Sequence, residues 1–142
     1  MTRISLESAN IIIAAAFEKG AELGLNPLSV AVVDPGGNLI AFQRQDKASY
    51  LRHQIAAGKA AGALALGVSS RTIEKMAIER PTFITSLGPV TPFGIIPAAG
   101  GVIVLNENGD TLGAVGTTGD TSDNDEKCTL AGIEAAGLLA QK

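Results

Sequence analysis

Apolar and polar positions along this chain alternate with two periods, and each period predicts a different kind of element. In residues 5–24 the apolar side chains recur at helical spacing, with Ser5 as the N-cap and Gly24 at the end. The same signals predict further helices at residues 49–66, from Ser69 or Ser70 to about residue 78, and from about residue 122 to about residue 140.

Strand-type patterns occur twice, each time around a strong turn signal. Residues 28–44 carry two β-type runs around Pro35-Gly36, which is typical of a type II turn because glycine accepts the positive φ of the second corner. Residues 102–117 carry two more runs around Asn108-Gly109. Two hairpins separated and flanked by helices predict an α+β fold with an antiparallel sheet, not a wound βαβ sheet.

Residues 81–101 show neither period. They hold four of the six prolines and four glycines, which predicts a long loop. Loops of this length are uncommon inside a domain and are often functional or mobile, although a plain surface connection remains the alternative. The 142 residues, without internal repeat or low-complexity linker, predict a single domain over 1–142.

Composition and charge exclude several classes of function. A net charge of −3 and the absence of any Lys/Arg run argue against nucleic acid as a partner. The chain shows no signal-peptide pattern and no apolar stretch near 18 residues, so we expect a cytoplasmic protein without a membrane segment. The single Cys128 excludes an internal disulfide and a multi-cysteine zinc site. Aromatic residues make up only 4% of the chain, which favours close backbone packing or a homo-oligomer.

The strongest local candidate for chemistry is the glycine-rich turn after residue 115. It leads into the last helix, where free N–H groups can hold a carboxylate, so we expect ligand contacts here. The candidates are Thr117, Thr118, Gly119 and Thr121. Asp125 and Glu126 follow as candidate bases or metal ligands, although acidic residues in a first turn also stabilise the helix dipole.

Three other side chains could take part in a site. His53, the only histidine, is either a packed or surface residue or an axial ligand to haem iron. Lys59 could bind an anion or extend to the surface, and lies on a different helical stripe from His53. Arg44 could bind a carboxylate, or pair with Asp46 at a sheet edge. Cys128 follows the apolar spacing of the last helix, which favours a buried role.

Four short segments occur in a recognisable order. They are residues 30–39, 56–60, 100–102 and 113–116, the last followed by Asp125-Glu126. In this order they resemble the GlcG/HbpS family of small haem-binding-like proteins, which also forms the C-terminal domain of PduO-type corrinoid adenosyltransferases. The resemblance covers nearly the whole chain and implies a profilin-like α+β fold, homo-oligomers and, for some members, haem binding.

The chain departs from the family pattern at named positions. Gly62 stands where the family has a threonine, Ile103 stands where it has a proline, and the first helix carries no histidine. A haem iron would therefore be bound by another residue. The candidates are His53, Met76, Cys128 or a threonine of residues 117–121.

Two functions follow as hypotheses. The first is a cytoplasmic, oligomeric protein that binds a small-molecule ligand, with haem or another tetrapyrrole as the candidate. The alternative is a small catabolic enzyme (an isomerase, hydratase or lyase) that acts on an organic acid. In that case Lys59 or Arg44 holds the carboxylate, and Asp125 or Glu126 moves the proton. A purely accessory subunit without a ligand is a third possibility.

Overall fold

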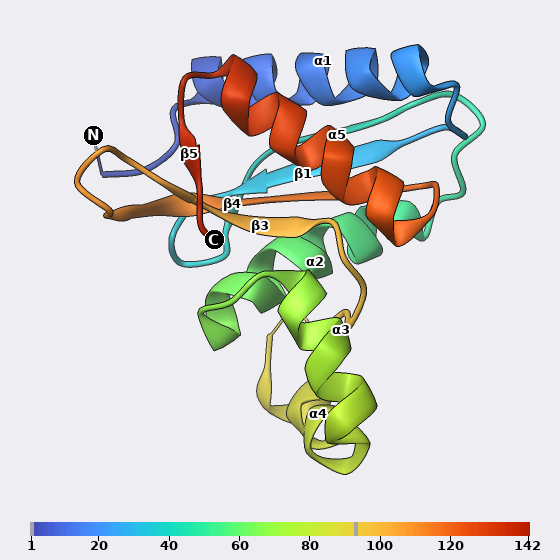
Figure 1. Ribbon diagram of the computed structural model, residues 1–142, viewed down its shortest axis with the longest axis vertical. Helices are drawn as coiled ribbons and strands as arrows, with labels where there is room; N and C mark the ends of the chain where they lie inside the picture. Colours follow the sequence, from blue (N-terminus) through green and yellow to red (C-terminus); the bar gives the residue numbers. More distant parts are fainter. Residues whose placement is uncertain (1, 93) are drawn as a thin grey trace.

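The structure is a computed structural model that describes residues 2–92 and 94–142. Figure 1 shows these ranges and labels most of their helices and strands. The helices are α1 (Leu6–Leu23), α2 (Arg52–Leu66), α3 (Ser70–Glu79), α4 (Pro81–Leu87), the short 3₁₀ helix η1 (Gly88–Val90) and α5 (Ser122–Ala135). The strands are β1 (Ser29–Val33), β2 (Leu39–Arg44), β3 (Gly101–Leu105), β4 (Thr111–Thr118) and β5 (Leu139–Ala140).

One sheet of five strands forms the middle layer. Its order is β2-β1-β4-β3-β5, and every neighbouring pair is antiparallel. Helices α1 and α5 cover one face, and α2 covers the other (Figure 1). On the α2 side, α3, α4 and η1 project away from the sheet and together form an arm, residues 70–90. The predicted α+β fold with an antiparallel sheet is confirmed.

Alternation along the strands divides the core between the two faces. Val30 and Val32 of β1 belong to the main core beneath α1 and α5, whereas Val33 packs with α2. All five β1 residues are buried because both faces of this strand are covered, which explains the nearly continuous apolar run in the sequence. The main core comprises Ile4, Ala9, Ile12, Ile13, Ala16, Leu28, Val30, Val32, Val102, Val104, Leu112, Val115, Cys128 and Ile133.

Two glycines bring α2 unusually close to the sheet. A Cβ on Gly101 would collide with the Lys59 carbonyl, and a Cβ on Gly116 would collide with the Ala56 carbonyl. These two glycines are partners on β3 and β4. The backbone of α2 therefore lies directly on the backbone of the two strands, and this contact determines where α2 presents its side chains.

The prediction of a loop over residues 81–101 is wrong in its first half. Residues 81–90 form α4 and η1, each with a proline in its first turn. Proline suits that position because its missing N–H would have no helical partner and its φ is already helical. Pro81 and Pro89 are equally typical of loops, but here they lie in the first turns of these two helices.

Two further details differ from the sequence prediction. The last helix ends at Ala135, and after Gly137 (φ 73°) the chain continues as β5 beside β3. In the first hairpin the positive φ belongs to Gly37 (82°), not to Gly36, so the turn at Pro35-Gly36 is not type II. Asp34 holds this turn, because its Oδ1 accepts hydrogen bonds from the backbone N–H groups of Gly36 and Asn38.

Candidate functional site

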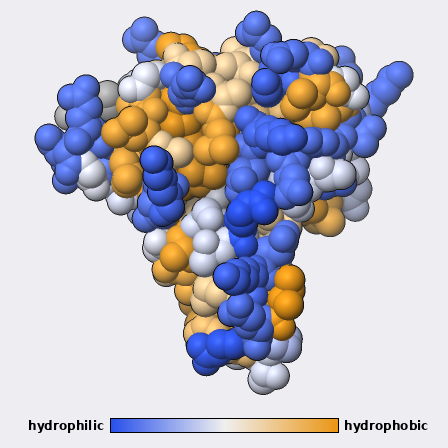
Figure 2. Space-filling view, in the orientation of Figure 1, coloured by the Kyte–Doolittle hydropathy of each residue, from blue (hydrophilic) through white to orange (hydrophobic). Residues whose placement is uncertain are grey.

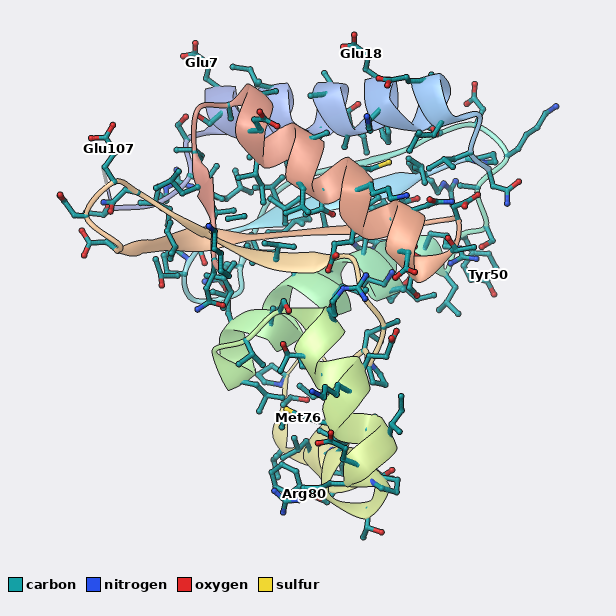
Figure 3. The ribbon with its side chains drawn as sticks, viewed as in Figure 1. Glu7, Glu18, Tyr50, Met76, Arg80 and Glu107 are labelled. Atoms are coloured by element: carbon teal, nitrogen blue, oxygen red, sulfur yellow. The ribbon has the colours of Figure 1, made fainter. Side chains whose placement is uncertain are left out.

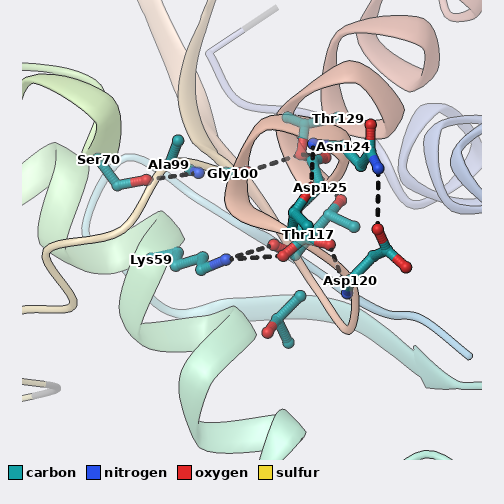
Figure 4. Close-up of polar contacts among 12 residues, drawn as sticks. Lys59, Ser70, Ala99, Gly100, Thr117, Asp120, Asn124, Asp125 and Thr129 are labelled. Atoms are coloured by element: carbon teal, nitrogen blue, oxygen red, sulfur yellow. Dashed lines mark hydrogen bonds and ion pairs between the residues drawn. The ribbon is translucent and has the colours of Figure 1, made fainter. Parts of the chain in front are cut away.

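Two of the predicted site residues, Lys59 and Asp125, form a buried ion pair. Lys59 Nζ lies 3.2 Å from Asp125 Oδ2 and donates a hydrogen bond of 3.0 Å to the Thr117 carbonyl (Figure 4). Their side chains are only 3% and 2% exposed. Lys59 belongs to α2 and Asp125 to α5, so the pair joins helices on opposite faces of the sheet. The alternative that Lys59 extends to the surface is wrong.

The ion pair lies at one end of the sheet, next to the start of β3 and the end of β4. Gly100 has a φ of 131°, and a Cβ there would collide with the Thr117 carbonyl and crowd Lys59 Nζ. Thr129 of α5 completes the packing, because its hydroxyl lies 2.6 Å from the Gly100 carbonyl and 2.8 Å from Thr117 Oγ1. Thr129 was missed in the sequence, although it lies one helical turn after Asp125 and so faces the same way.

Burial dominates the electrostatics of this pair. Loss of hydration lowers the pKa of Lys59 and raises the pKa of Asp125, while the attraction between the two charges acts in the opposite direction on each. The Asp125 carboxylate is also held by the backbone N–H of Asp120, 2.9 Å from its Oδ1. Both groups are thus engaged within the protein, as a link between layers.

The predicted anion-binding turn is occupied by its own side chains. Thr121 caps α5, since its Oγ1 accepts from the Asn124 N–H, and Asp120 accepts from the Asn124 amide and the Asn26 N–H. These hydrogen bonds lower the pKa of Asp120. Gly119 (φ 144°) packs against the backbone at Pro27, so the turn is closed on that side as well.

Next to this turn, Thr118 receives a hydrogen bond of 2.8 Å from Arg52 Nη1. Thr118 is the β4 partner of Ser29 on β1, and the Ser29 hydroxyl is buried with no partner among the described residues. The two hydroxyls and Arg52 form a small polar cluster beneath the first turn of α2. The cluster is closed to solvent on the sheet side, because Ser29 is 0% and Thr118 1% exposed.

Glu126 and Arg44 lie apart from the buried pair and from each other. Both carboxylate oxygens of Glu126 accept from Arg71 Nε at 3.0 Å, and Arg71 Nη2 reaches Asp123, so Arg71 ties α3 to α5. These acceptors hold the pKa of Arg71 above its ordinary value. Arg44 forms no ion pair with Asp46 in the described parts of the chain, which makes that expected pair wrong. Arg44 and Asp46 both line a cavity of about 600 Å³ between α1 and the end of β2.

His53 lines a different, mostly apolar groove of about 430 Å³. The groove lies between α2 and the first hairpin, and the small residues Ala57 and Gly58 leave its floor open. A narrower hollow of about 150 Å³ shares Gly37 and Pro92 with it. The described lining contains no acidic side chain, and consists of Val33, Gly37, Leu39, His53, Gln54, Ala57, Gly58 and Pro92.

The imidazole of His53 is free to bind a ligand. It is exposed, and no described residue makes a hydrogen bond with either ring nitrogen. The Phe42 ring of β2 lies against it, with ring centroids 4.7 Å apart. A groove of this size and character is typical of small-molecule and cofactor sites, so the residues present fit a haem with one protein ligand. Phe42 was missed in the sequence, because the register of β1 and β2 shifts next to it, so that Ile40 packs on the main core while Phe42 faces α2.

The other candidate iron ligands are less well placed. Cys128 is buried in the main core, and burial raises the pKa of its thiol to about 11, which disfavours the thiolate. Met76 lies on the arm, well separated from Tyr50, which precedes α2 (Figure 3). Within residues 2–92 and 94–142 no group of three or more His, Cys, Asp or Glu could hold a metal ion. No described helix is both long and apolar enough to cross a membrane.

A second apolar hollow, of about 590 Å³, opens beside β5 and α5. Figure 2 shows orange side chains gathered there, and among its lining residues are Val102, Leu130, Ile133, Leu138 and Leu139. It carries no histidine, in contrast to the groove at α2. The only described side chain with a free imidazole therefore lies at the α2 groove.

Comparisons with known proteins identify similar sequences and folds. The model of a family described as haem degrading protein HbpS-like matches residues 4–134. A protein of Citrobacter freundii, described as an uncharacterized 15.0 kDa protein in the dhaT-dhaS intergenic region, is 31% identical over 122 residues, which cover 86% of this chain and 84% of that protein.

Solved structures show the same fold. The Klebsiella pneumoniae protein ORFY is 27% identical, with a TM-score of 0.85 over 96% of this chain and 92% of that one. A double mutant of Streptomyces reticuli HbpS is 29% identical, with a TM-score of 0.80 over 94% of this chain and 87% of that one. A PduOC:heme complex has a TM-score of 0.86 over 99% of both chains, but at 18% identity it bears on the fold alone.

Proposed function

The chain belongs to the haem degrading protein HbpS-like family, and from this premise we propose that it binds haem with His53 as the iron ligand. The observation that carries the proposal is the free imidazole of His53 on the wall of an apolar groove. Neutral imidazole is a common axial ligand of haem iron, and an apolar wall favours the faces of a macrocycle. The description of the family, haem degrading protein HbpS-like, supports a haem-related role.

The protein's own residues would contribute binding and orientation. Ala57 and Gly58 leave space beside α2 for a planar ligand, and Val33 and Leu39 supply apolar contacts. The absence of acidic side chains from the described lining removes charge repulsion toward an acid-bearing ligand. When bound, haem supplies iron-centred redox and ligand-binding chemistry, which the axial ligand and the polarity of the groove adjust.

The proposal is tested by titrating the purified protein with haemin and following visible absorption. We expect a sharp Soret band that saturates at a fixed ratio of haem to chain. His53→Ala should lose the saturating band, because His53 is the only histidine in the sequence. Glu18→Ala is the control: it changes an exposed side chain of α1, on the opposite face of the sheet from α2, and should leave the band in place.

Each result decides a separate point. A broad response of the wild-type protein that never saturates would contradict haem binding altogether. A saturating band that persists unchanged in His53→Ala would keep haem binding but refute His53 as the ligand. A further variant, Ala57→Leu, keeps the His53 imidazole but fills part of the groove, and should weaken binding if the groove holds the macrocycle.

A further inference from the structure

His53 lacks the support that a metal-binding histidine usually has. Such a histidine nearly always donates its second ring N–H to a carboxylate, a carbonyl or a water, which fixes the orientation of the ring. In the described parts of the chain no side chain or backbone group makes such a bond with His53. The residue also lies in the first turn of α2, which has no side-chain cap, and it is exposed. Its orientation must therefore come from packing.

Phe42 is the residue that supplies this packing. The two ring centroids are 4.7 Å apart and the ring planes are inclined by 56°. This separation and tilt lie within the range of favourable aromatic pairs, which contribute about 0.5–1.5 kcal/mol beyond the area they bury. The Phe42 ring covers one side of the imidazole, while the groove lies open to it elsewhere.

Phe42 is itself fixed by the sheet. It pairs with Ala31 of β1, which is fully buried, and it lies on the α2 face of β2. It is half-buried, in contrast to the exposed Gln43 and Arg44 that follow it. A side chain on a hydrogen-bonded strand thus steadies a side chain on a neighbouring helix, and the rigid sheet sets the position of the imidazole.

We propose that Phe42 is the positioning residue for His53, holding the imidazole ready for a ligand in the groove. The effect on haem binding rests on the proposed function, whereas the orientation of His53 by Phe42 is a property of the ligand-free protein. A side chain that is already oriented loses less conformational freedom when it binds the iron. Removing the Phe42 ring should therefore weaken haem binding, although the His53 imidazole is still present. Loss of an orienting partner typically costs about 10–100-fold in metal affinity.

The first test uses NMR of the ligand-free protein. His53 is the only histidine, so its imidazole gives one set of ring resonances. We expect the Phe42 ring current to displace these resonances in the wild-type protein, and Phe42→Leu to return them toward values for a free histidine. Phe42→Tyr keeps the ring and should preserve the displacement. Unchanged resonances in Phe42→Leu would overturn the inference, whatever the protein binds.

The second test is the haemin titration of the same variants. We expect Phe42→Leu to weaken haem binding about tenfold and to change the Soret spectrum, with Phe42→Tyr restoring both. Phe17→Leu, which changes a phenylalanine packed on the main core, controls for a general loss of stability and should bind as wild type. A Phe42→Leu protein that binds haem as tightly as wild type, while His53→Ala does not, overturns the inference and leaves the proposed function standing.

Discussion

At the scale of single residues, the buried Lys59–Asp125 pair connects α2 to α5 but adds little to the net free energy of unfolding. Burial costs both charges their hydration, which is why the pKa of Lys59 is lowered and that of Asp125 is raised despite their attraction. Buried pairs of this kind often contribute little net stability, whereas breaking one leaves an uncompensated charge. The pair therefore selects one arrangement of α2 relative to α5.

Substitutions at the two members of this pair should be strongly non-additive. Lys59→Met should lower the free energy of unfolding by about 3–5 kcal/mol, because it leaves the Asp125 carboxylate buried and unpaired. Lys59→Met combined with Asp125→Asn should recover most of this loss. The asparagine carries no charge and its side-chain oxygen still accepts from the Asp120 N–H.

Urea denaturation of the wild type, both single variants and the double variant measures the coupling. If the double variant is as unstable as the sum of the two single variants, the two side chains act independently and the pair is not a coupled unit. The denaturant slopes should stay equal among the four proteins, since a changed slope would report a changed unfolded or native state.

At the scale of elements, the contact between α2 and the sheet depends on glycines where a side chain cannot fit. Gly116→Ala should destabilise the protein by about 1–3 kcal/mol, since its Cβ would collide with the Ala56 carbonyl and α2 would have to move. Gly62→Ala is the matched control within α2. Its Cβ would meet the Gly94 carbonyl and Ile95 at 3.5 Å, which is ordinary contact.

The two substitutions should change the free energy of unfolding in opposite directions. Gly62→Ala should stabilise by about 0.5–1 kcal/mol, because alanine loses less backbone freedom in a helix than glycine does. Thermal or urea unfolding of both variants gives the comparison. Equal losses at the two positions would mean that the protein does not tolerate even a methyl group anywhere around α2, and that the close approach at Gly116 is not special.

The elements that were predictable from sequence are those whose signals are local. Ser5 caps α1 and Gly24 ends it with φ 67°, as the sequence alone indicates. β5 was missed because two residues carry no pattern; Leu139 and Ala140 become a strand only by pairing with β3. α4 was missed because its proline is also typical of loops.

Within the candidate site, residue types could be predicted and their partners could not. Lys59 and Asp125 were both identified as chemically capable, yet they are 66 positions apart and meet only because α2 and α5 converge at one end of the sheet. The separation of His53 from Lys59 did follow from helical spacing. The contact of His53 with Phe42 depends on β2 lying beside α2, which no spacing within either element indicates.

At the scale of the whole molecule, apolar side chains remain exposed over several elements. Ile78 and Val90 of the arm are 78% and 74% exposed, and Tyr50 before α2 is 82% exposed. Scattered exposed apolar residues are normal, but a projecting arm that carries them is suited to contact with another chain. The homo-oligomer expected from the sequence stays a prediction, which sedimentation of the purified protein would test.

The arm should also be the least stable part of the monomer fold. Of the seven α4 residues only Ile84 is buried, whereas α1 buries five residues against the main core. Regions with few buried apolar contacts open at lower free energy than the core, so amide hydrogen exchange should be faster in α4 and η1 than in β1 and β4. Arg71→Ala, which removes the contacts to Asp123 and Glu126, should accelerate exchange in α3 further.

The exchange experiment distinguishes an independent arm from one that is held by the rest of the molecule. Dilution of the protein is the necessary control, because a partner chain seated on the arm would protect it in a concentration-dependent way. Protection of α4 equal to that of β1 at every concentration would contradict the prediction. It would mean that residues 70–90 unfold only with the sheet, and that the few contacts of Ser70 and Glu74 with residues 99–101 suffice to make the arm part of one cooperative unit.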